Sequence, residues 1–163
     1  MRRLLIVCIC FIVAGCMGVR NVPQSRQVEI SRIYNLPYDE VWPAIVEIFA
    51  EKNIPIRTIE KNSGIIAGEP SNVPWEHDHL SLRSKFCDCG HPGGMVALVG
   101  LHGQCNIFVK KLSDMETSVQ VNTIYKADVY DPFMKQITFQ WDCQTTGSLE
   151  RNLLDRIETK LNK

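Results

Sequence analysis

The first 16 residues constrain this chain most, because they decide in which compartment the rest of it folds. Two arginines precede an apolar run over residues 4–13, and two small residues then lead to Cys16. A basic, an apolar and a small-residue segment in this order are typical of an export signal. The apolar run has about ten residues, whereas a helix needs about 20 to span a bilayer. We therefore expect a signal peptide over residues 1–15 rather than a transmembrane helix.

The end of this signal, Val13-Ala14-Gly15-Cys16, resembles a bacterial lipobox. Such a motif predicts cleavage before Cys16 and a covalent lipid on its sulfur, which anchors the mature chain without spanning the membrane. Several acyl chains on one cysteine hold firmly, because each buried methylene contributes about 0.8 kcal/mol. Met17 stands where an aspartate indicates inner-membrane retention in known lipoproteins. We therefore expect the outer membrane, with the domain facing the periplasm.

The mature chain is expected to form one short tether and one domain. Residues 16–26 contain Pro23 and lack apolar periodicity, which predicts a lipidated N-terminus and tether. Residues 27–163 are long enough for a single domain with its own core. Without Arg2 and Arg3, 16 basic residues remain against 18 acidic ones, a formal charge of −2. No basic stripe is present to release counterions from a phosphate backbone, which excludes nucleic acid as a partner.

Hydrophobic periodicity predicts an α+β domain. Apolar residues at three-and-four spacing predict helices over residues 38–52 and 149–161, with Trp42 on the core-facing side of the first. Alternation and turn residues predict strands over residues 27–34, 54–60, 65–69, 106–112, 116–125 and 136–143, and a short one over 80–86. The order strand, helix, hairpin, then hairpin, strand, helix predicts an antiparallel sheet of about five to six strands with two helices packed on one face.

Two finer placements follow from these elements. Phe139, Trp141 and Cys143 alternate along the last strand, and we expect the face that they share to be buried. Thr146 or Ser148 can cap the closing helix, and the sequence leaves the choice between them open.

Four cysteines remain once the signal and Cys16 are set aside: Cys87, Cys89, Cys105 and Cys143. An exported domain folds where thiols are oxidised, which favours disulfides. Cys87 and Cys89 are too close in the chain to pair with each other, so we expect each to bridge to one of the other two. The pairing between the two sets stays open. A bridge to Cys143 would close a loop of about 50 residues and stabilise the fold by about 4 kcal/mol.

The same region offers a metal site as an alternative. Its candidate ligands are Cys87, Cys89, His91 and Cys105. They supply thiolates and an imidazole in the number that tetrahedral zinc requires. The Cys-x-Cys spacing lacks the two intervening residues that are usual in zinc sites, so disulfides are the favoured interpretation. A redox role is weaker still, because glycine and proline follow Cys89 instead of the helix start that lowers a thiol pKa.

The sequence carries none of the catalytic motifs G-x-S-x-G or H-E-x-x-H, and no phosphate-binding loop. The polar segment Glu76-His77-Asp78-His79 is expected to be a solvated loop rather than an acid/base cluster. We therefore expect a non-enzymatic protein without a cofactor, whose only added group is the covalent lipid on Cys16.

Several short motifs are spread over nearly the whole chain. They are Val13-Ala14-Gly15-Cys16, Leu36-Pro37-Tyr38-Asp39-Glu40-Val41-Trp42, Ser63-Gly64-Ile65-Ile66, Asp88-Cys89-Gly90 and Cys143-Gln144-Thr145-Thr146-Gly147-Ser148-Leu149-Glu150. Together they resemble small BamC-like envelope lipoproteins, named after the accessory lipoprotein of the outer-membrane barrel-assembly machinery. The resemblance implies an α+β domain with helices on one face of an antiparallel sheet, and a non-enzymatic role. It also implies that Cys89 pairs with Cys143, which leaves Cys87 for Cys105.

The first functional hypothesis is a lipid-anchored, non-enzymatic periplasmic binding or scaffold module that acts in outer-membrane assembly or maintenance. Its partners would be the membrane and other envelope proteins. The alternative is a carrier of a small hydrophobic ligand. A strand, a Pro-x-x-x-Val-Trp helix start, a curved sheet and a terminal helix in this order also resemble helix-grip lipid-binding domains. A Cys/His metal or redox protein is the third hypothesis.

Overall fold

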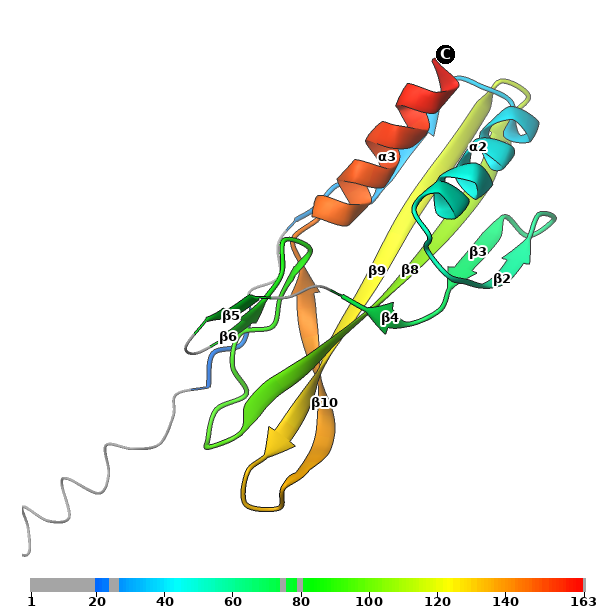
Figure 1. Ribbon diagram of the computed structural model, residues 1–163. Coiled ribbons are helices and arrows are strands. Elements are labelled where there is room, and N and C mark those ends of the chain that lie inside the picture. Colours follow the sequence, from blue (N-terminus) through cyan, green and yellow to red (C-terminus); the bar gives the residue numbers. More distant parts are fainter. Residues whose placement is uncertain (1–19, 24–26, 74–75, 79–80, 163) are drawn as a thin grey trace, which may run out of the picture.

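The computed structural model describes residues 20–23, 27–73, 76–78 and 81–162 (Figure 1). The expected signal peptide, Cys16 and most of the expected tether lie outside these residues, so the lipid on Cys16 stays a prediction. Within the described part, no helix has the length and apolar character needed to cross a membrane.

The described chain forms two helices and a sheet of ten strands, which makes it an α+β protein as predicted. The first half holds β1 Ser31–Tyr34, α2 Tyr38–Glu51, β2 Ile56–Glu60, β3 Ile65–Gly68 and β4 Ser71–Asn72. The second half holds β5 Glu76–Asp78, β6 Ser81–Arg83, β7 Cys87–Asp88, β8 Ala97–Ser113, β9 Glu116–Asp131, β10 Gln136–Thr145 and α3 Ser148–Leu161. Strands outnumber the expected five to six, because the segment between β3 and β8 forms short strands. Three residues of the polar segment expected to be a loop, Glu76–Asp78, form one of them, β5, which pairs with β6; the fourth, His79, lies outside the described residues.

All strand pairs are antiparallel, in the order β2-β3-β8-β9-β10-β7-β6-β5, while β1 pairs with β9 and β4 with β8. The long hairpin of β8 and β9, 17 and 16 residues, is the spine of this sheet. The sequence predicts only part of the hairpin. Gly100, Gly103 and a register shift after Leu98 interrupt the alternation of β8, which hides its first half.

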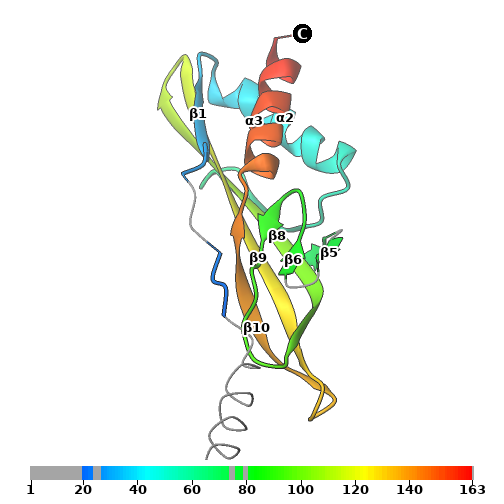
Figure 2. The ribbon, with the colours of Figure 1, turned by 90° about the vertical axis from the view of Figure 1, so that its left-hand side faces the viewer.

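One edge of β9 is shared by two strands, and this divides the hairpin into two halves. β1 pairs with residues 117–120 of β9, and β10 pairs with residues 125–131 (Figure 2). We call the part next to β1 the upper half and the part next to β10 the lower half. Each half carries its own hydrophobic core.

Both helices pack on one face of the upper half, as predicted (Figure 1). Ile45 and Phe49 of α2 and Leu153 of α3 are buried against sheet residues such as Val121. Trp42 is 7% exposed in the same core, which confirms its placement. Each large apolar side chain buried in this way contributes about 2 kcal/mol, so this core is the main source of stability.

The lower half is covered by the segment around β7. Cys87 and Cys89 are fully buried against Leu101, Tyr125 and Ala127. This covering layer is thin, because β7 pairs with β10 through only two residue pairs. Side-chain contacts and a covalent link must therefore hold it in place.

The predicted burial of the last strand is only partly right. Phe139, Trp141 and Cys143 do face one side, since each lies opposite a residue of the lower core. Cys143 is buried, but Phe139 is 48% exposed. β7 pairs with residues 144–145 at the upper end of β10, so the covering layer does not reach Phe139.

The predicted cap of the closing helix is wrong. The N-cap of α3 is Gly147, with a left-handed φ of 78° and no side-chain cap. A Cβ on this residue would lie 2.7 Å from the side chain of Val28, so only glycine fits. Thr146 precedes the N-cap position, where its hydroxyl donates to the carbonyl oxygen of Lys85 at 2.7 Å and accepts a long hydrogen bond from the backbone N–H of Ser148 at 3.4 Å.

Candidate functional site

A pocket of about 200 Å³ lies where the end of α2, β4 and β8 meet the start of α3. Residues of both cores contribute to its wall, which is mainly apolar. Among them are Ile54, Pro55, Val73, Phe86, Cys105, Tyr125 and Leu149. A small, largely apolar cavity with a few polar groups is the usual form of a ligand site.

Tyr125 lines this pocket and carries a buried hydroxyl. Its side chain comes from β9, is 3% exposed and lines the wall. Among the described residues, none forms a hydrogen bond of good geometry with this hydroxyl, although Thr123 lies close enough to lower its pKa slightly. Burial, and after it the charge of Glu150, raises the pKa of Tyr125, so the hydroxyl stays neutral and can donate. A buried polar group without a partner costs about 1–3 kcal/mol, so this hydroxyl is a polar group that the fold leaves unsatisfied.

Glu150 places a buried carboxylate beside the same wall. It lies in the first turn of α3, is 1% exposed and directly follows the lining residue Leu149. Its Oε1 accepts hydrogen bonds from Thr123 Oγ1 at 2.5 Å and from Thr145 Oγ1 at 2.8 Å. Its Oε2 has no hydrogen-bond partner among the described residues. Two hydroxyls therefore fix one carboxylate oxygen and leave the other able to accept a hydrogen bond.

Cys105 adds a thiol to the wall. It lies in β8, is 5% exposed and takes no part in a disulfide. Burial, and after it the charge of Glu150, raises the pKa of Cys105 to about 12. The thiol therefore stays protonated at neutral pH and is a poor nucleophile. The groups in and beside the pocket are thus suited to non-covalent binding.

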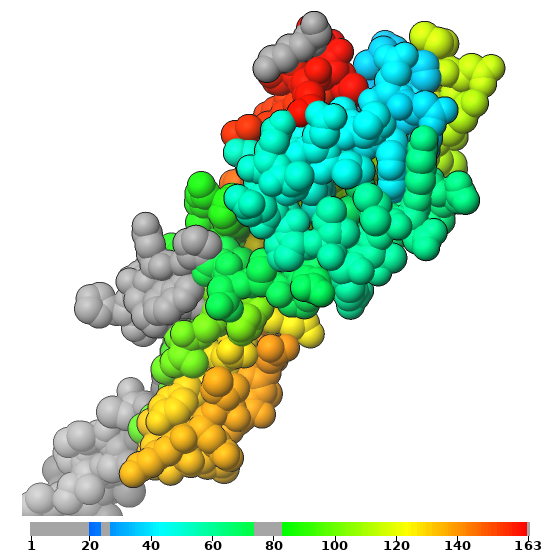
Figure 3. All heavy atoms as spheres, turned by 45° about the vertical axis from the view of Figure 1, so that its right-hand side comes forward, coloured from blue at the N-terminus to red at the C-terminus, as the bar shows by residue number. Residues whose placement is uncertain are grey.

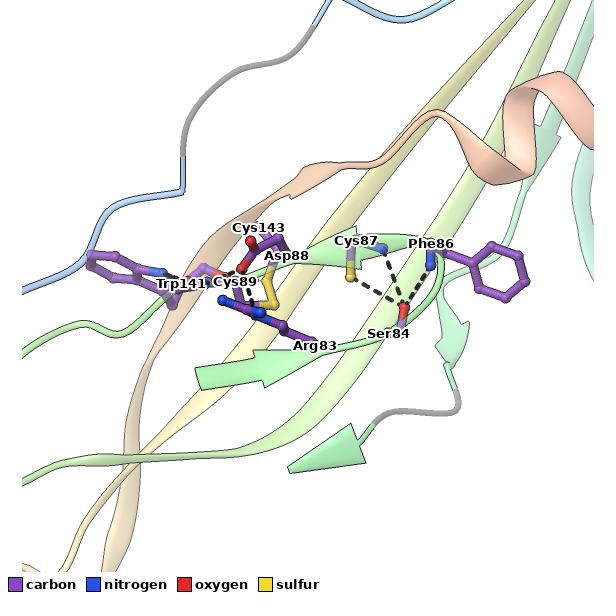
Figure 4. The surroundings of a disulfide bond; sticks show 9 residues. Arg83, Ser84, Phe86, Cys87, Asp88, Cys89, Trp141 and Cys143 are labelled. Carbon is purple, nitrogen blue, oxygen red and sulfur yellow. Dashed lines mark hydrogen bonds and ion pairs between the residues drawn. A yellow bond between two sulfur atoms is a disulfide. The ribbon is translucent and has the colours of Figure 1, made fainter. Parts of the chain in front are cut away.

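A cluster of three cysteines lies in the lower core (Figure 4). Cys89 and Cys143 form a disulfide that links residues 54 apart in the chain. This confirms the pairing implied by the family resemblance. The sulfur of Cys87 lies within 4.8 Å of the other two sulfurs and 3.6 Å from Ser84 Oγ.

The second expected bridge, from Cys87 to Cys105, is not formed, and both residues are buried thiols. Cys87 lies in β7 and Cys105 in β8, and β10 and β9 stand between these strands in the sheet. Cys87 belongs to the lower core and Cys105 to the upper core, so the two side chains lie in different clusters of buried residues. The prediction fails because spacing along the chain does not reveal which strands separate two cysteines.

The alternative metal set is likewise not brought together in the described structure. It comprised Cys87, Cys89, His91 and Cys105. The cluster in the structure consists of Cys87, Cys89 and Cys143, and contains neither His91 nor Cys105. Two of its three sulfurs are joined to each other, so they cannot serve as thiolate ligands.

The thiol of Cys87 is not prepared for redox exchange either. Burial raises the pKa of Cys87 to about 11. Attack on a disulfide requires the thiolate, which is scarce at neutral pH when the pKa is this high. At neutral pH, Cys87 therefore packs beside the disulfide and does not exchange with it.

Glu150 is the candidate that sequence analysis missed. Leu153, Leu154 and Ile157 follow it at i+3, i+4 and i+7, and all are buried. A carboxylate on the apolar face of an amphipathic helix is a usable signal, because unpaired acidic side chains are almost never fully buried. Tyr125 offered no such signal, since a tyrosine on the inner face of a strand is common.

Comparisons with known proteins do not assign this chain to a family. No protein-family model matches it. No curated protein sequence matches it either. The BamC-like resemblance therefore rests on the short motifs alone, and the fold and the pocket carry the functional argument.

Proposed function

We propose that this chain is a lipid-anchored, non-enzymatic binding module that works at the periplasmic face of the outer membrane. Of the forms considered from the sequence, the pocket favours the carrier of a small hydrophobic ligand. The observation that carries this choice is the mainly apolar pocket of about 200 Å³, in whose wall Tyr125 is 3% exposed and carries a buried hydroxyl without a hydrogen-bond partner among the described residues.

The chemistry of the wall defines the class of ligand. Val73, Phe86 and Leu149 supply apolar contacts, and the Tyr125 hydroxyl donates a hydrogen bond. A cavity of about 150 Å³ is known to hold benzene, so the pocket of about 200 Å³ suits one ring or a short acyl segment. The ligand is therefore a small apolar molecule, or the end of a larger one, with one oxygen that accepts from Tyr125.

Phenol and benzene are matched probes for this pocket, because they differ by one hydroxyl. Both should raise the thermal unfolding temperature of the full chain, and phenol should raise it more. Tyr125→Phe should abolish the advantage of phenol and keep the effect of benzene. Val73→Trp, which fills the pocket, should abolish both effects. Val99→Trp is the matched control, because Val99 is 39% exposed on β8 and does not line the pocket.

A native ligand can be sought directly by organic extraction of the purified protein and mass spectrometry. A compound that co-purifies with the wild type and is lost in Val73→Trp supports the proposal. The carrier function is overturned if neither phenol nor benzene shifts the unfolding temperature and no compound can be extracted from the protein. The anchor is tested separately, by the mass of the N-terminal peptide and its retention in the detergent phase.

A scaffold role remains the second candidate, because the sheet face opposite the helices carries exposed apolar side chains. Phe108 and Ile124 are 44% and 47% exposed, and their neighbours in sequence point into the cores. Photocrosslinking from position 124 in the native envelope would capture a protein partner of this face. Crosslinking from Arg156, on the exposed side of α3, is the control. Equal products from both positions would contradict a scaffold role for the sheet face.

A further inference from the structure

The turn between β9 and β10 exposes apolar side chains at the tip of a projecting arm. Phe133 is 71% exposed and Met134 is 64% exposed. Ile137 and Phe139, on the strand just behind them, are 55% and 48% exposed. Figure 3 shows this hairpin end (orange) standing clear of the body formed by the helices and β2–β3. We refer to Phe133 and Met134 together as the arm tip.

The backbone holds the arm tip in an outward position. Asp131 Oδ1 accepts hydrogen bonds from the backbone N–H of Phe133 at 2.8 Å and of Met134 at 3.1 Å. Lys135 closes the turn with a left-handed φ of 54°. The carboxylate of Asp131 thus stabilises the turn, and the hydrogen-bonded backbone holds the side chains of Phe133 and Met134 outward.

The N-terminal segment of the described domain is fixed to the same arm (Figure 2). The guanidinium of Arg20 lies 4.9 Å from the ring centre of Trp141, on β10. Asn21 and His91 exchange two backbone hydrogen bonds of 2.9 and 2.8 Å. Gly90 allows this approach, because a Cβ there would collide with the carbonyl oxygen of Asn21. The chain therefore leaves the domain beside the middle of β10.

Chain length then limits how far the anchor can be from the arm tip. Cys16 precedes Arg20 by four positions in the chain, a distance that spans at most about 14 Å. From Trp141, where Arg20 is bound, β10 continues for about 17 Å to its lower end at Gln136. The arm tip lies beyond that end. Its distance from the site where Arg20 is bound is therefore at least as large as the greatest distance between Arg20 and Cys16.

We propose that the arm tip enters the interfacial layer of the bilayer that carries the lipid anchor. This inference rests on the anchor part of the proposed function. Apolar side chains gain by leaving water for the boundary of the acyl chains, and a second attachment fixes the orientation of a protein held by one lipidated residue. Lys135, next to the arm tip, lies at the level of lipid phosphates. The helices and the pocket then face away from the membrane, toward the periplasm.

A matched pair of labelled positions tests the proposal on the full, lipidated chain. Met134→Cys carries a fluorescent NBD label at the arm tip. Met115→Cys carries the same label at the opposite end of β9, where Met115 is similarly exposed, at 59% against 64%. The native thiols of Cys87 and Cys105 are buried and do not compete for the label. Vesicles of phosphatidylcholine and phosphatidylglycerol contain a lipid with a nitroxide quencher near its headgroup.

The expected result is a blue shift and several-fold stronger quenching at position 134 than at position 115. Phe133→Ser in the position-134 protein should remove most of that difference. Vesicle flotation reports on the anchor separately. A protein that floats while both labels are quenched equally overturns the membrane contact and leaves the anchor intact. A protein that does not float overturns the anchor and the contact together.

Discussion

The indole Nε1 of Trp141 donates a hydrogen bond of 2.7 Å to the carbonyl oxygen of Cys89 (Figure 4). The side chain of Cys89 forms a disulfide with Cys143, which follows Trp141 by two residues on β10. β10 therefore holds the covering layer of the lower core at two points, one covalent and one through a hydrogen bond. This explains how a layer that pairs with β10 through only two residue pairs stays in place.

Removing the disulfide with Cys89→Ala and Cys143→Ala should lower the free energy of unfolding by about 4 kcal/mol, because the bridge restricts a loop of about 50 residues in the unfolded chain. Urea denaturation measures the change. Trp141→Phe is the comparison, since it keeps an aromatic ring but removes the hydrogen bond to Cys89, and it should cost less than loss of the disulfide, about 1 kcal/mol for the hydrogen bond. An unchanged urea midpoint after loss of both cysteines would contradict the covalent contribution.

Loss of the hydroxyl should affect the stability of the fold differently at two buried tyrosines. Tyr34 donates to the carbonyl oxygen of Leu154 at 2.9 Å, so Tyr34→Phe should destabilise the fold by about 1 kcal/mol. Tyr125 has no partner among the described residues, so Tyr125→Phe should leave the ligand-free protein equally or more stable. Thermal unfolding of both variants, after organic extraction, checks this. A comparable loss in both would show that the Tyr125 hydroxyl is already satisfied.

The pair of His102 and Asp128 should make stability fall in acid. His102 Nε2 lies 2.8 Å from Asp128 Oδ2, and this hydrogen bond is the main reason why the pKa of Asp128 lies below its ordinary value of 3.8. A carboxyl whose pKa is lowered by folding stabilises the fold above about pH 4, and the contribution disappears as the pH falls through the folded-state pKa. The free energy of unfolding should fall less between pH 6 and pH 2 in Asp128→Asn than in the wild type. The difference should be up to about 1 kcal/mol, because the pair is partly exposed. Identical pH profiles would contradict the assignment.

The two thiols should be protected until the protein unfolds. Iodoacetamide at neutral pH should leave the folded chain unmodified at Cys87 and Cys105, since both are buried and carry raised pKa values. In urea without reductant it should modify both, and after reduction also the two disulfide cysteines. Intact mass of the mature chain counts the groups. No modification in urea would instead indicate the second bridge that the structure lacks.

The same thiols should reduce stability at alkaline pH. Folding raises the pKa of Cys87 to about 11 and that of Cys105 to about 12, from an ordinary value of 9.0. Above about pH 9 the unfolded chain therefore loses these protons before the folded chain does, and the free energy of unfolding falls as the pH rises. Urea midpoints at pH 8 and 10 measure this change, and Cys105→Ala should show a smaller difference between them than the wild type.

Local patterns were sufficient for the elements whose stability depends on one apolar face. The helix at residues 38–52 and the helix at residues 149–161 were placed to within about a turn, because three-and-four spacing is recorded in the sequence itself. The first half of β8 and the small strands β4, β5 and β7 were missed, whereas β6 lies within the short strand expected over residues 80–86. Glycines break the alternation in β8, and strands of two or three residues are too short to show a pattern.

The candidate site was less accessible than the fold. Cys89 and Cys143 were paired correctly, but Cys87 and Cys105 were paired wrongly, since pairing depends on strand order. The pocket depends on contacts between segments far apart in the chain, with Tyr125 from β9 and Glu150 from α3.

By itself, the sequence determined the α+β class, the two helices and the shared face on which they pack, because those follow from local periodicity. It also supplied the expectation of an exported, lipid-anchored chain. Only the tertiary structure decided that the long hairpin carries two separate cores, that Glu150 and Tyr125 lie buried near one pocket, and that the arm tip projects beside the chain's N-terminal exit. These features arise from strand order and from distances between segments remote in sequence, and no local pattern of residue types records either.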